Sequence, residues 1–288
     1  MPNRLPEARV IARPAGVRSG KAGSDPNFMT SLARGLSVIR AFTGANPQLS
    51  IAEVARMSGL PRAAARRCLH TLERLGYVGS DGRRFSLRPK ILALGYAFMS
   101  STPIAATLQP VLERVSERLH ESSSAAALDE DEIVYIARAA TRRIMSVTLN
   151  VGSRLPAYCT SMGRVLLAQL PRNELDEFLG RARLKPITEK TVTSRDALRR
   201  ILEQVLEKGY ALVDQELEIG LRSIAVPVRA AGGTVIAAMN ASAQAARISR
   251  REMEARFLPA LQQGAGDVAQ LFVRTGLSGV AHSIGRPT

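Results

Sequence analysis

Two helices separated by a tight turn occupy residues 50–76, and this pattern constrains the fold more than any other part of the chain. Ser50 followed three residues later by Glu53 is a capping box, which predicts a short helix over residues 51–57. The sequence SGLP then forms a turn. The next helix runs from its proline to Gly76, because proline suits a first helical turn and glycine the position after the last. The arrangement predicts a helix-turn-helix.

The flanking segments extend this prediction to a winged helix-turn-helix over residues 28–88. A preceding helix begins at Ser31, and one of its faces is apolar through Leu32, Leu36, Ile39 and Phe42. Residues 77–79 and 84–87 are predicted to be short strands around the turn SDG, which is a hairpin signal. In this fold the third helix enters the major groove of DNA.

The third helix combines an apolar stripe with a basic end. Its inward face is predicted to contain Leu60, Ala64, Cys68, Leu69, Leu72 and Leu75. Its first two turns are basic, although a helix dipole favours acids there. The residues predicted to contact DNA are Arg62, Ala63, Arg66 and Arg67 at the helix start, and Arg83 and Arg84 at the wing tip. The alternative is a solvated basic helix in which Arg66 or Arg67 forms a structural salt bridge.

The net charge of +15 is concentrated in the first part of the chain. Residues 29–100 hold 11 Lys and Arg against 3 Asp and Glu, whereas residues 101–288 hold 24 against 20. A basic block beside a nearly balanced one predicts that the first part binds a polyanion and that the second part has another role.

Residues 89–103 are predicted to be a linker helix. Apolar side chains are distributed around almost the whole circumference of this helix: Ile91, Leu92, Leu94, Phe98 and Met99. Such a helix between two domains needs a partner, and pairing with a second copy of the chain would make a homodimer.

The remaining sequence predicts an α+β domain over residues 104–275. Helical and strand-like segments follow one another without clean βαβ repeats, which favours a mostly antiparallel sheet flanked by helices. An acidic turn at 129–132 joins two strands, and a further strand is predicted over 143–152. Residues 1–27 show no periodicity and, with 276–288, are predicted to be disordered tails.

The sequence offers little support for an enzyme, a metal site or a membrane protein. None of the histidines, His70, His120 and His282, has a cysteine or acid at a useful spacing, and the motifs G-x-S-x-G, G-x-G-x-x-G and the P-loop are missing. Cys68 and Cys159 form neither a zinc spacing nor a disulfide framework, which indicates a reducing cytoplasm. No apolar run approaches the roughly 18 residues that span a bilayer. We expect no catalytic residue, no metal and no cofactor, and we expect Cys159 to be a buried thiol rather than a redox sensor.

Four motifs resemble those of the IclR-type transcriptional regulators. They are SLARGLSVIRAF from Ser31, SIAEVARMSGLPRAAARRCLHTLERLGYV from Ser50, GSRLPAYCTSMGRVLLA from Gly152 and DQELEIGLRSIAVPV from Asp214. The resemblance is greatest to the pca-type and pob-type regulators of the β-ketoadipate pathway. It implies a winged helix-turn-helix, a linker helix and a GAF-like effector-binding domain. It also implies a homodimer or tetramer on a pseudo-palindromic double-stranded promoter site, with RNA polymerase as a further candidate partner.

The resemblance further implies a site for a small organic acid, with β-ketoadipate, protocatechuate and 4-hydroxybenzoate as the leading candidates. Three segments should line it: the helix start Ser161, Met162, Gly163 and Arg164; the pair Asp214 and Ser223; and the strand residues Asn240 and Ser242. Arg154, Tyr158 and Arg222 are further candidates to meet a second carboxylate. A helix N-terminus offers free N–H groups to a carboxylate, and a glycine permits close approach.

Two functions of different class remain open on the sequence. The favoured one is a ligand-responsive regulator that controls genes for aromatic-acid catabolism. The alternative is a small-molecule-binding or esterase-like domain with an incidental basic N-terminus. Binding to a palindromic promoter fragment that is lost above moderate salt would separate the two.

Overall fold

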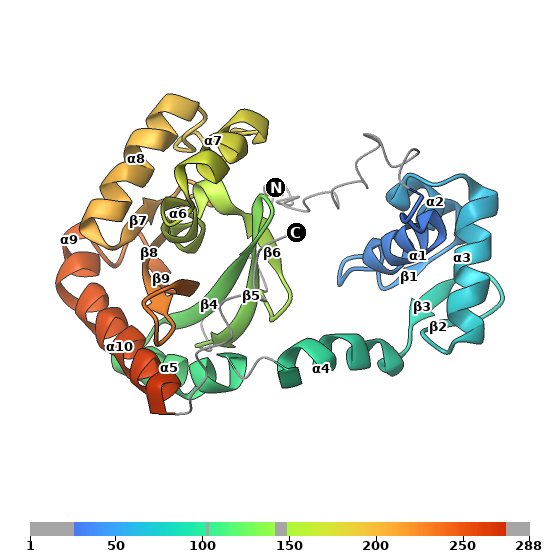
Figure 1. The fold of residues 1–288 in the computed structure, drawn as a ribbon, viewed down its shortest axis with the longest axis horizontal. Coiled ribbons are helices and arrows are strands. Elements are labelled where there is room, and N and C mark those ends of the chain that lie inside the picture. The colour runs from blue at the N-terminus through green and yellow to red at the C-terminus, as the bar shows by residue number, and fades with distance from the viewer. Residues whose placement is uncertain (1–25, 102–103, 142–148, 275–288) are drawn as a thin grey trace, which may run out of the picture. The chain divides into compact units, whose positions relative to one another are not determined.

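A computed structural model describes residues 26–101, 104–141 and 149–274 (Figure 1). The chain divides into two compact units, Met1–Ser100 and Ser101–Thr288. The tails predicted to be disordered, residues 1–27 and 276–288, lie outside the described residues, apart from residues 26–27. Most of the strand predicted over 143–152 also lies outside them, and its described part, residues 149–152, contains no strand.

Three helices surround the core of the first unit: α1 (Thr30–Ala41), α2 (Ile51–Ser58) and α3 (Arg62–Arg74). The predicted capping box is present, because Ser50 Oγ accepts from Glu53 N and the Glu53 carboxylate accepts from Ser50 N at 2.8 Å. These bonds satisfy backbone donors that a helix start leaves free. Gly76 follows α3 with φ +80°, a left-handed conformation that favours glycine.

A three-stranded sheet completes the first unit. It contains β1 (Gln48–Leu49), β2 (Val78–Ser80) and β3 (Phe85–Leu87) in the order β1-β3-β2. The predicted hairpin is confirmed, with Val78 opposite Leu87, and Asp81 closes its turn by accepting from the backbone N–H groups of Arg83 and Arg84. The short strand β1 was not predicted. The unit is the expected winged helix-turn-helix.

The predicted inward faces of α1 and α3 are partly wrong. Val38 and Ala41 of α1 are buried, whereas Leu32 and Leu36 are 59% and 49% exposed. In α3 the buried side chains are Ala65, Leu69 and Leu72, and Leu75 is 52% exposed. The apolar surface of both helices is wider than the small core that they share, so part of it remains at the surface.

A short linker segment follows the wing. It consists of a 3-10 turn, Pro89–Ile91, and the helix α4 (Leu92–Ser101). Lys90 Nζ donates to the Leu75 carbonyl at 2.9 Å, at the C-terminal end of α3. Leu92, Leu94 and Tyr96 are all half or more exposed, so the described residues of this unit leave apolar surface of the helix uncovered.

The second unit is built on a six-stranded sheet in the order β6-β5-β4-β9-β8-β7, with every pairing antiparallel. The strands are β4 (Ser122–Asp129), β5 (Glu132–Ala139), β6 (Arg154–Pro156), β7 (Ala211–Asp214), β8 (Leu221–Arg229) and β9 (Val235–Gln244). The mostly antiparallel sheet was predicted, and β6 was missed.

Helices cover both faces of this sheet (Figure 1). One face carries α5 (Ile104–Leu119) and α10 (Leu258–Arg274), which follows a three-residue helix α9 (Arg250–Glu252) and a π-helical turn, Met253–Phe257. The other face carries α6 (Ser161–Ala168), with α7 (Arg172–Arg181) and α8 (Arg195–Lys208) in the same apolar cluster. Five large apolar residues of α5 are buried: Leu108, Val111, Leu112, Val115 and Leu119. None of the helices in the described ranges combines the length and apolar character needed to cross a bilayer.

Candidate functional site

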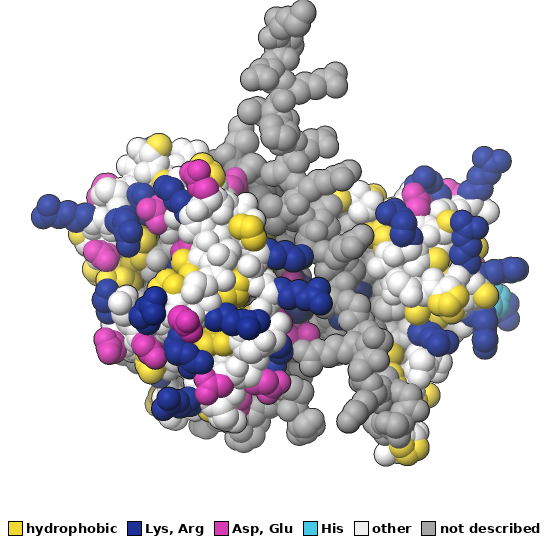
Figure 2. Space-filling model, turned by 90° about the horizontal axis from the view of Figure 1, so that it is seen from above, with side chains coloured by type: hydrophobic (Ala, Val, Ile, Leu, Met, Phe, Trp, Pro, Cys, Tyr) yellow, Lys and Arg dark blue, Asp and Glu magenta, His cyan; other side chains and the backbone are white. Residues whose placement is uncertain are grey.

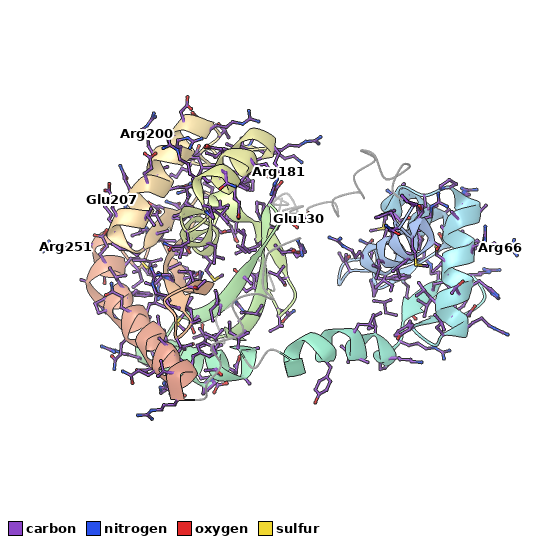
Figure 3. All side chains as sticks on the ribbon, viewed as in Figure 1. Arg66, Glu130, Arg181, Arg200, Glu207 and Arg251 are labelled. Atoms are coloured by element: carbon purple, nitrogen blue, oxygen red, sulfur yellow. The ribbon has the colours of Figure 1, made fainter. Side chains whose placement is uncertain are left out.

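The arginines at the start of α3 and at the wing tip are exposed. Figure 2 shows more Lys and Arg than Asp and Glu on the visible face of the first unit, and Figure 3 shows Arg66 pointing away from it. Within the described residues, no ion pair includes Arg62, Arg66 or Arg67, so the structural salt bridge considered for Arg66 or Arg67 is not formed there. Ala63 is exposed beside them. The helix therefore presents unneutralised charge at its N-terminal end.

The two wing arginines differ. Arg84 NH1 donates to the Gln48 carbonyl at 3.1 Å and lies 3.9 Å from the Glu53 carboxylate, which ties it to the base of the wing. Arg83 is exposed at the tip and has no side-chain hydrogen bond to the described residues. Arg83 is the better placed of the two for a phosphate.

In the second unit, strand register gathers polar side chains on the face of the sheet that α6 covers. Asn240 lies opposite Ser124, and Ser242 lies between Ser122 and Ser223. Residues at alternate positions share a face, so these side chains point the same way. Asn240 Nδ2 donates to Ser242 Oγ at 3.2 Å.

The start of α6 completes this group, which we call the polar sheet face: Ser122, Ser124, Ser161, Ser223, Asn240 and Ser242. Ser223 Oγ donates to Ser161 Oγ at 2.9 Å, and both residues are buried. Because Ser161 accepts this bond, its own hydroxyl proton can be donated elsewhere. Four of the residues predicted to bind the effector thus lie together: Ser161, Ser223, Asn240 and Ser242.

Gly163 has a packing role that the sequence prediction did not include. A Cβ atom at this position would lie 2.1 Å from the Ala157 carbonyl oxygen and 2.4 Å from its Cα, so the glycine allows α6 to pack on the preceding backbone. Its N–H is also taken, because it donates to Thr160 Oγ1 at 3.2 Å. Met162 is 1% exposed and belongs to the apolar core. The close approach that the sequence suggested is between two parts of the chain.

The arginines predicted to meet carboxylates of the effector are already paired with acids of the chain. Arg164 forms a buried, two-pronged ion pair with Glu216, and each terminal nitrogen lies 2.7 Å from a carboxylate oxygen. Arg154, on β6, holds the acidic turn through Asp129 at 2.5 Å and Glu132 at 2.7 Å. Ion pairs therefore hold the acidic turn at 129–132 to β6.

Arg222 and Asp214 likewise satisfy each other, with Arg222 Nε and NH2 3.0 and 2.9 Å from Asp214 Oδ1. Arg222 NH1 also donates to the carbonyl groups of Ala245 and Ile248, which fixes the chain after β9. The two charges are therefore paired with each other, and a paired buried charge is costly to separate.

Tyr158 and Cys159 are structural in this arrangement. The Tyr158 hydroxyl donates to the Lys185 carbonyl at 2.7 Å, which pins the loop after α7. Cys159 is fully buried, and burial raises the pKa of its thiol to about 12. A thiol of this kind is almost never ionised near neutral pH, which agrees with the buried thiol expected from the sequence.

Sequence reasoning missed Arg138 on β5. It lies opposite Ser124, and its NH1 donates to Ser124 Oγ at 3.1 Å. Among the described residues, no carboxylate pairs with Arg138. The serines at alternate positions 122 and 124 are the signal in the sequence for a polar face on this strand. Within the same ranges, no group of His, Cys, Asp and Glu is arranged to hold a metal ion.

The sequence patterns of two known domains match the chain. The IclR helix-turn-helix domain matches residues 31–82, and the domain described as the bacterial transcriptional regulator IclR C-terminal matches residues 96–270. The chain belongs to the IclR family of bacterial transcriptional regulators. The basic N-terminus is therefore not incidental, because it is this family's helix-turn-helix.

Other members of the IclR family resemble this chain over most of its length. It is 52% identical to the Pca regulon regulatory protein of Pseudomonas putida over 265 residues, and this matched region covers 91% of each chain. It is 33% identical over 250 residues to the p-hydroxybenzoate hydroxylase transcriptional activator of Acinetobacter baylyi, which covers 85% of this chain and 92% of the relative. Both relatives are regulators of gene expression by name.

Solved structures of IclR-family proteins have the same fold. A transcriptional regulator from Rhodococcus sp. RHA1 is 46% identical and superposes with a TM-score of 0.75, over 86% of this chain and all of that one. An IclR homologue from Microbacterium hydrocarbonoxydans, solved in complex with 4-hydroxybenzoate, is 25% identical and has a TM-score of 0.74, over 85% and 100% of the two chains.

Proposed function

We propose that this IclR-type regulator binds a small organic acid on the polar sheet face and thereby alters its affinity for promoter DNA of aromatic-acid catabolic genes. The observation that carries the proposal is the meeting of Ser161, Ser223, Asn240 and Ser242 between α6 and the sheet. Hydroxyl and amide groups gathered in this way suit the oxygen atoms of β-ketoadipate, protocatechuate or 4-hydroxybenzoate. The names of the Pseudomonas and Acinetobacter relatives and the ligand of the Microbacterium homologue support this class.

The effector can change DNA binding only through a difference in its affinity for two arrangements of the protein. Titration calorimetry with the three acids, followed by DNA-binding assays with and without the acid that binds, tests the proposal. We expect one acid to bind and to shift the affinity for DNA. The variant Ser161→Ala/Ser223→Ala should lose acid binding and keep ligand-free DNA binding. If the variant binds the acid as tightly as the wild type, the polar sheet face is not the site.

We also infer that the protein binds a pseudo-palindromic site as a homodimer or as a tetramer. A groove of about 560 Å³ runs between α1 and α3 and is lined by apolar side chains that include Leu32, Leu36, Leu75 and Leu94. An apolar surface of this kind on both a DNA-binding helix and the linker is suited to a second copy of the chain, whose two-fold symmetry the DNA site would mirror.

RNA polymerase is a further proposed partner, and the cytoplasm, where the promoter is accessible, is the proposed location. A regulator of this architecture acts by binding rather than by catalysis. Transcription from a catabolic promoter with purified polymerase, with and without the protein and the acid, tests the partnership and shows the direction of control.

A further inference from the structure

We propose that Arg138 receives the carboxylate of the effector and that the hydrogen-bonded pair Ser161–Ser223 holds an oxygen at the ligand's opposite end. This inference rests on the proposed function, because it assigns a role within the same polar sheet face. Arg138 is not among the residues that the family resemblance implies for the effector site.

The site needs a source of positive charge. An organic anion that leaves water for a largely buried polar site needs a cation or several strong donors. Arg154, Arg164 and Arg222 are each neutralised by an acid of the chain at 2.5–3.0 Å. Arg138 lies on the same sheet, and its described contact is with a neutral hydroxyl.

Ser124 orients the guanidinium group of Arg138. Ser124 is 2% exposed, and its Oγ accepts from Arg138 NH1 at 3.1 Å, which holds the arginine over β4 and toward the other polar residues. A guanidinium group has five N–H donors in a planar fork, so this bond leaves donors for a two-pronged contact with a carboxylate. Ser124 is therefore a positioning residue.

The two ends of the proposed site lie on β4 and β8, with β9 between them. Along the sheet, β4 carries Ser124 beneath the guanidinium group, β9 carries Asn240 and Ser242, and β8 carries Ser223. Neighbouring strands lie about 4.8 Å apart, so Ser124 and Ser223 are separated by roughly two strand spacings, on the order of 10 Å. An aromatic acid with a hydroxyl opposite its carboxylate, or an extended keto acid, can reach across this distance when a hydrogen bond is added at each end.

The second end of the proposed site is the hydrogen-bonded pair Ser161–Ser223. Ser223 donates to Ser161, and Ser161 retains its own proton for a ligand oxygen. Asn240, between the two ends, can donate or accept. The site therefore fits an acid that has its carboxylate at Arg138 and a hydroxyl, keto or second acid oxygen at Ser161.

A cycle of residue and ligand changes tests the inference. Calorimetry with 4-hydroxybenzoate, protocatechuate and β-ketoadipate identifies the acid that the wild type binds, and its carboxamide is the matched uncharged probe. We expect Arg138→Met to weaken binding of the acid about 10- to 100-fold and to leave the weak binding of the carboxamide unchanged. Arg138→Lys, which keeps the charge but not the fork, should recover part of the loss. Arg114→Met, on the α5 face of the sheet, should bind as the wild type does.

The outcomes separate this inference from the proposed function. If the wild type binds an acid, and Arg138→Met weakens the acid and its carboxamide by equal factors, Arg138 does not hold the carboxylate and only this inference falls. If the wild type binds none of the three acids, the proposed effector class falls and takes this inference with it. Thermal unfolding of each variant shows whether it is folded. If Arg138→Met does not fold, Arg138→Lys provides the test. If the ratio of its affinity for the acid to its affinity for the carboxamide equals the wild-type ratio, the inference is overturned.

Discussion

Arg164 and Glu216 form a two-pronged ion pair inside the second unit, across 52 residues of sequence. Arg164 Nε also donates to the Tyr158 carbonyl at 2.9 Å, and the Val192 N–H donates to the Glu216 carboxylate at 3.0 Å. The pair thus ties the loop after β7 to α6 and to the segment before α8. The ion pair stabilises the fold, because both charges are buried and each neutralises the other.

Removing one partner of this pair should be severe. Arg164→Met leaves the Glu216 carboxylate buried without its counter-ion, and we expect a loss of about 3–5 kcal/mol in the free energy of unfolding. Arg199→Met is the matched control, because Arg199 pairs with Asp176 at 2.6 Å on the surface and should contribute about 0–1 kcal/mol. Urea unfolding measures both. Equal losses in the two variants would show that the buried pair has no special role.

Gly163→Ala should destabilise the second unit. The added Cβ would lie 2.1 Å from a backbone oxygen that cannot rotate away, so we expect a cost of about 1–3 kcal/mol or more in the free energy of unfolding. Gly180→Ala, within α7, meets nothing within 4 Å and should change the stability by less than about 1 kcal/mol. Thermal or urea unfolding compares them. A Gly163→Ala protein as stable as the wild type would contradict the packing role.

DNA binding should depend on the free arginines of α3. Replacing an arginine that contacts a phosphate weakens binding to all sequences and lowers the slope of log affinity against log salt by about 0.9. Replacing one that reads a base instead costs about 1–3 kcal/mol at one base position. Affinities of Arg62→Ala, Arg66→Ala and Arg67→Ala, measured at several salt concentrations, distinguish the two roles. Arg200→Ala, on α8 (Figure 3), is the control, and three unchanged affinities would mean that α3 is not the reading helix.

The two cysteines should differ in reactivity with a thiol reagent at pH 8. Burial raises the pKa of Cys159 to about 12, so its thiolate is scarce at this pH and its sulfur is inaccessible. Cys68 is only partly buried, although burial also raises the pKa of its thiol. We expect Cys68→Ser to be unreactive until urea is added and Cys159→Ser to react slowly in the native state. Rapid native modification of Cys159 would restore the redox-sensor hypothesis.

Assembly should depend on the groove between α1 and α3. A dimer or tetramer is expected for the wild type in sedimentation at micromolar concentration. Leu36→Glu places a charge in the groove and should shift the protein toward the monomer. Leu206→Glu, at an exposed leucine of α8, is the control and should keep the wild-type state. A monomeric wild type that still binds its promoter tightly would contradict the proposed dimer.

The sequence by itself determined the local elements of this protein. The capping box of Ser50 and Glu53, the glycine after α3 and the turn between β2 and β3 were predictable because each depends on contacts between residues a few positions apart. The apolar period of α5 and the alternation along β9 fixed which faces these elements bury. The motifs also sufficed for the family, since they extend over both units.

Tertiary structure decided which of these residues are available for function. Arg154, Arg164 and Arg222 look equivalent to Arg138 in the sequence, but their acidic partners lie up to 52 positions away and are brought to them only by the fold. The role of Gly163 depends on the backbone of Ala157 folding back on α6. The inward faces of α1 and α3 were overestimated because periodicity shows how wide an apolar stripe is, whereas burial depends on how much of it the neighbouring elements cover. Charge pairing and close packing are relations between distant segments, and no local pattern encodes them.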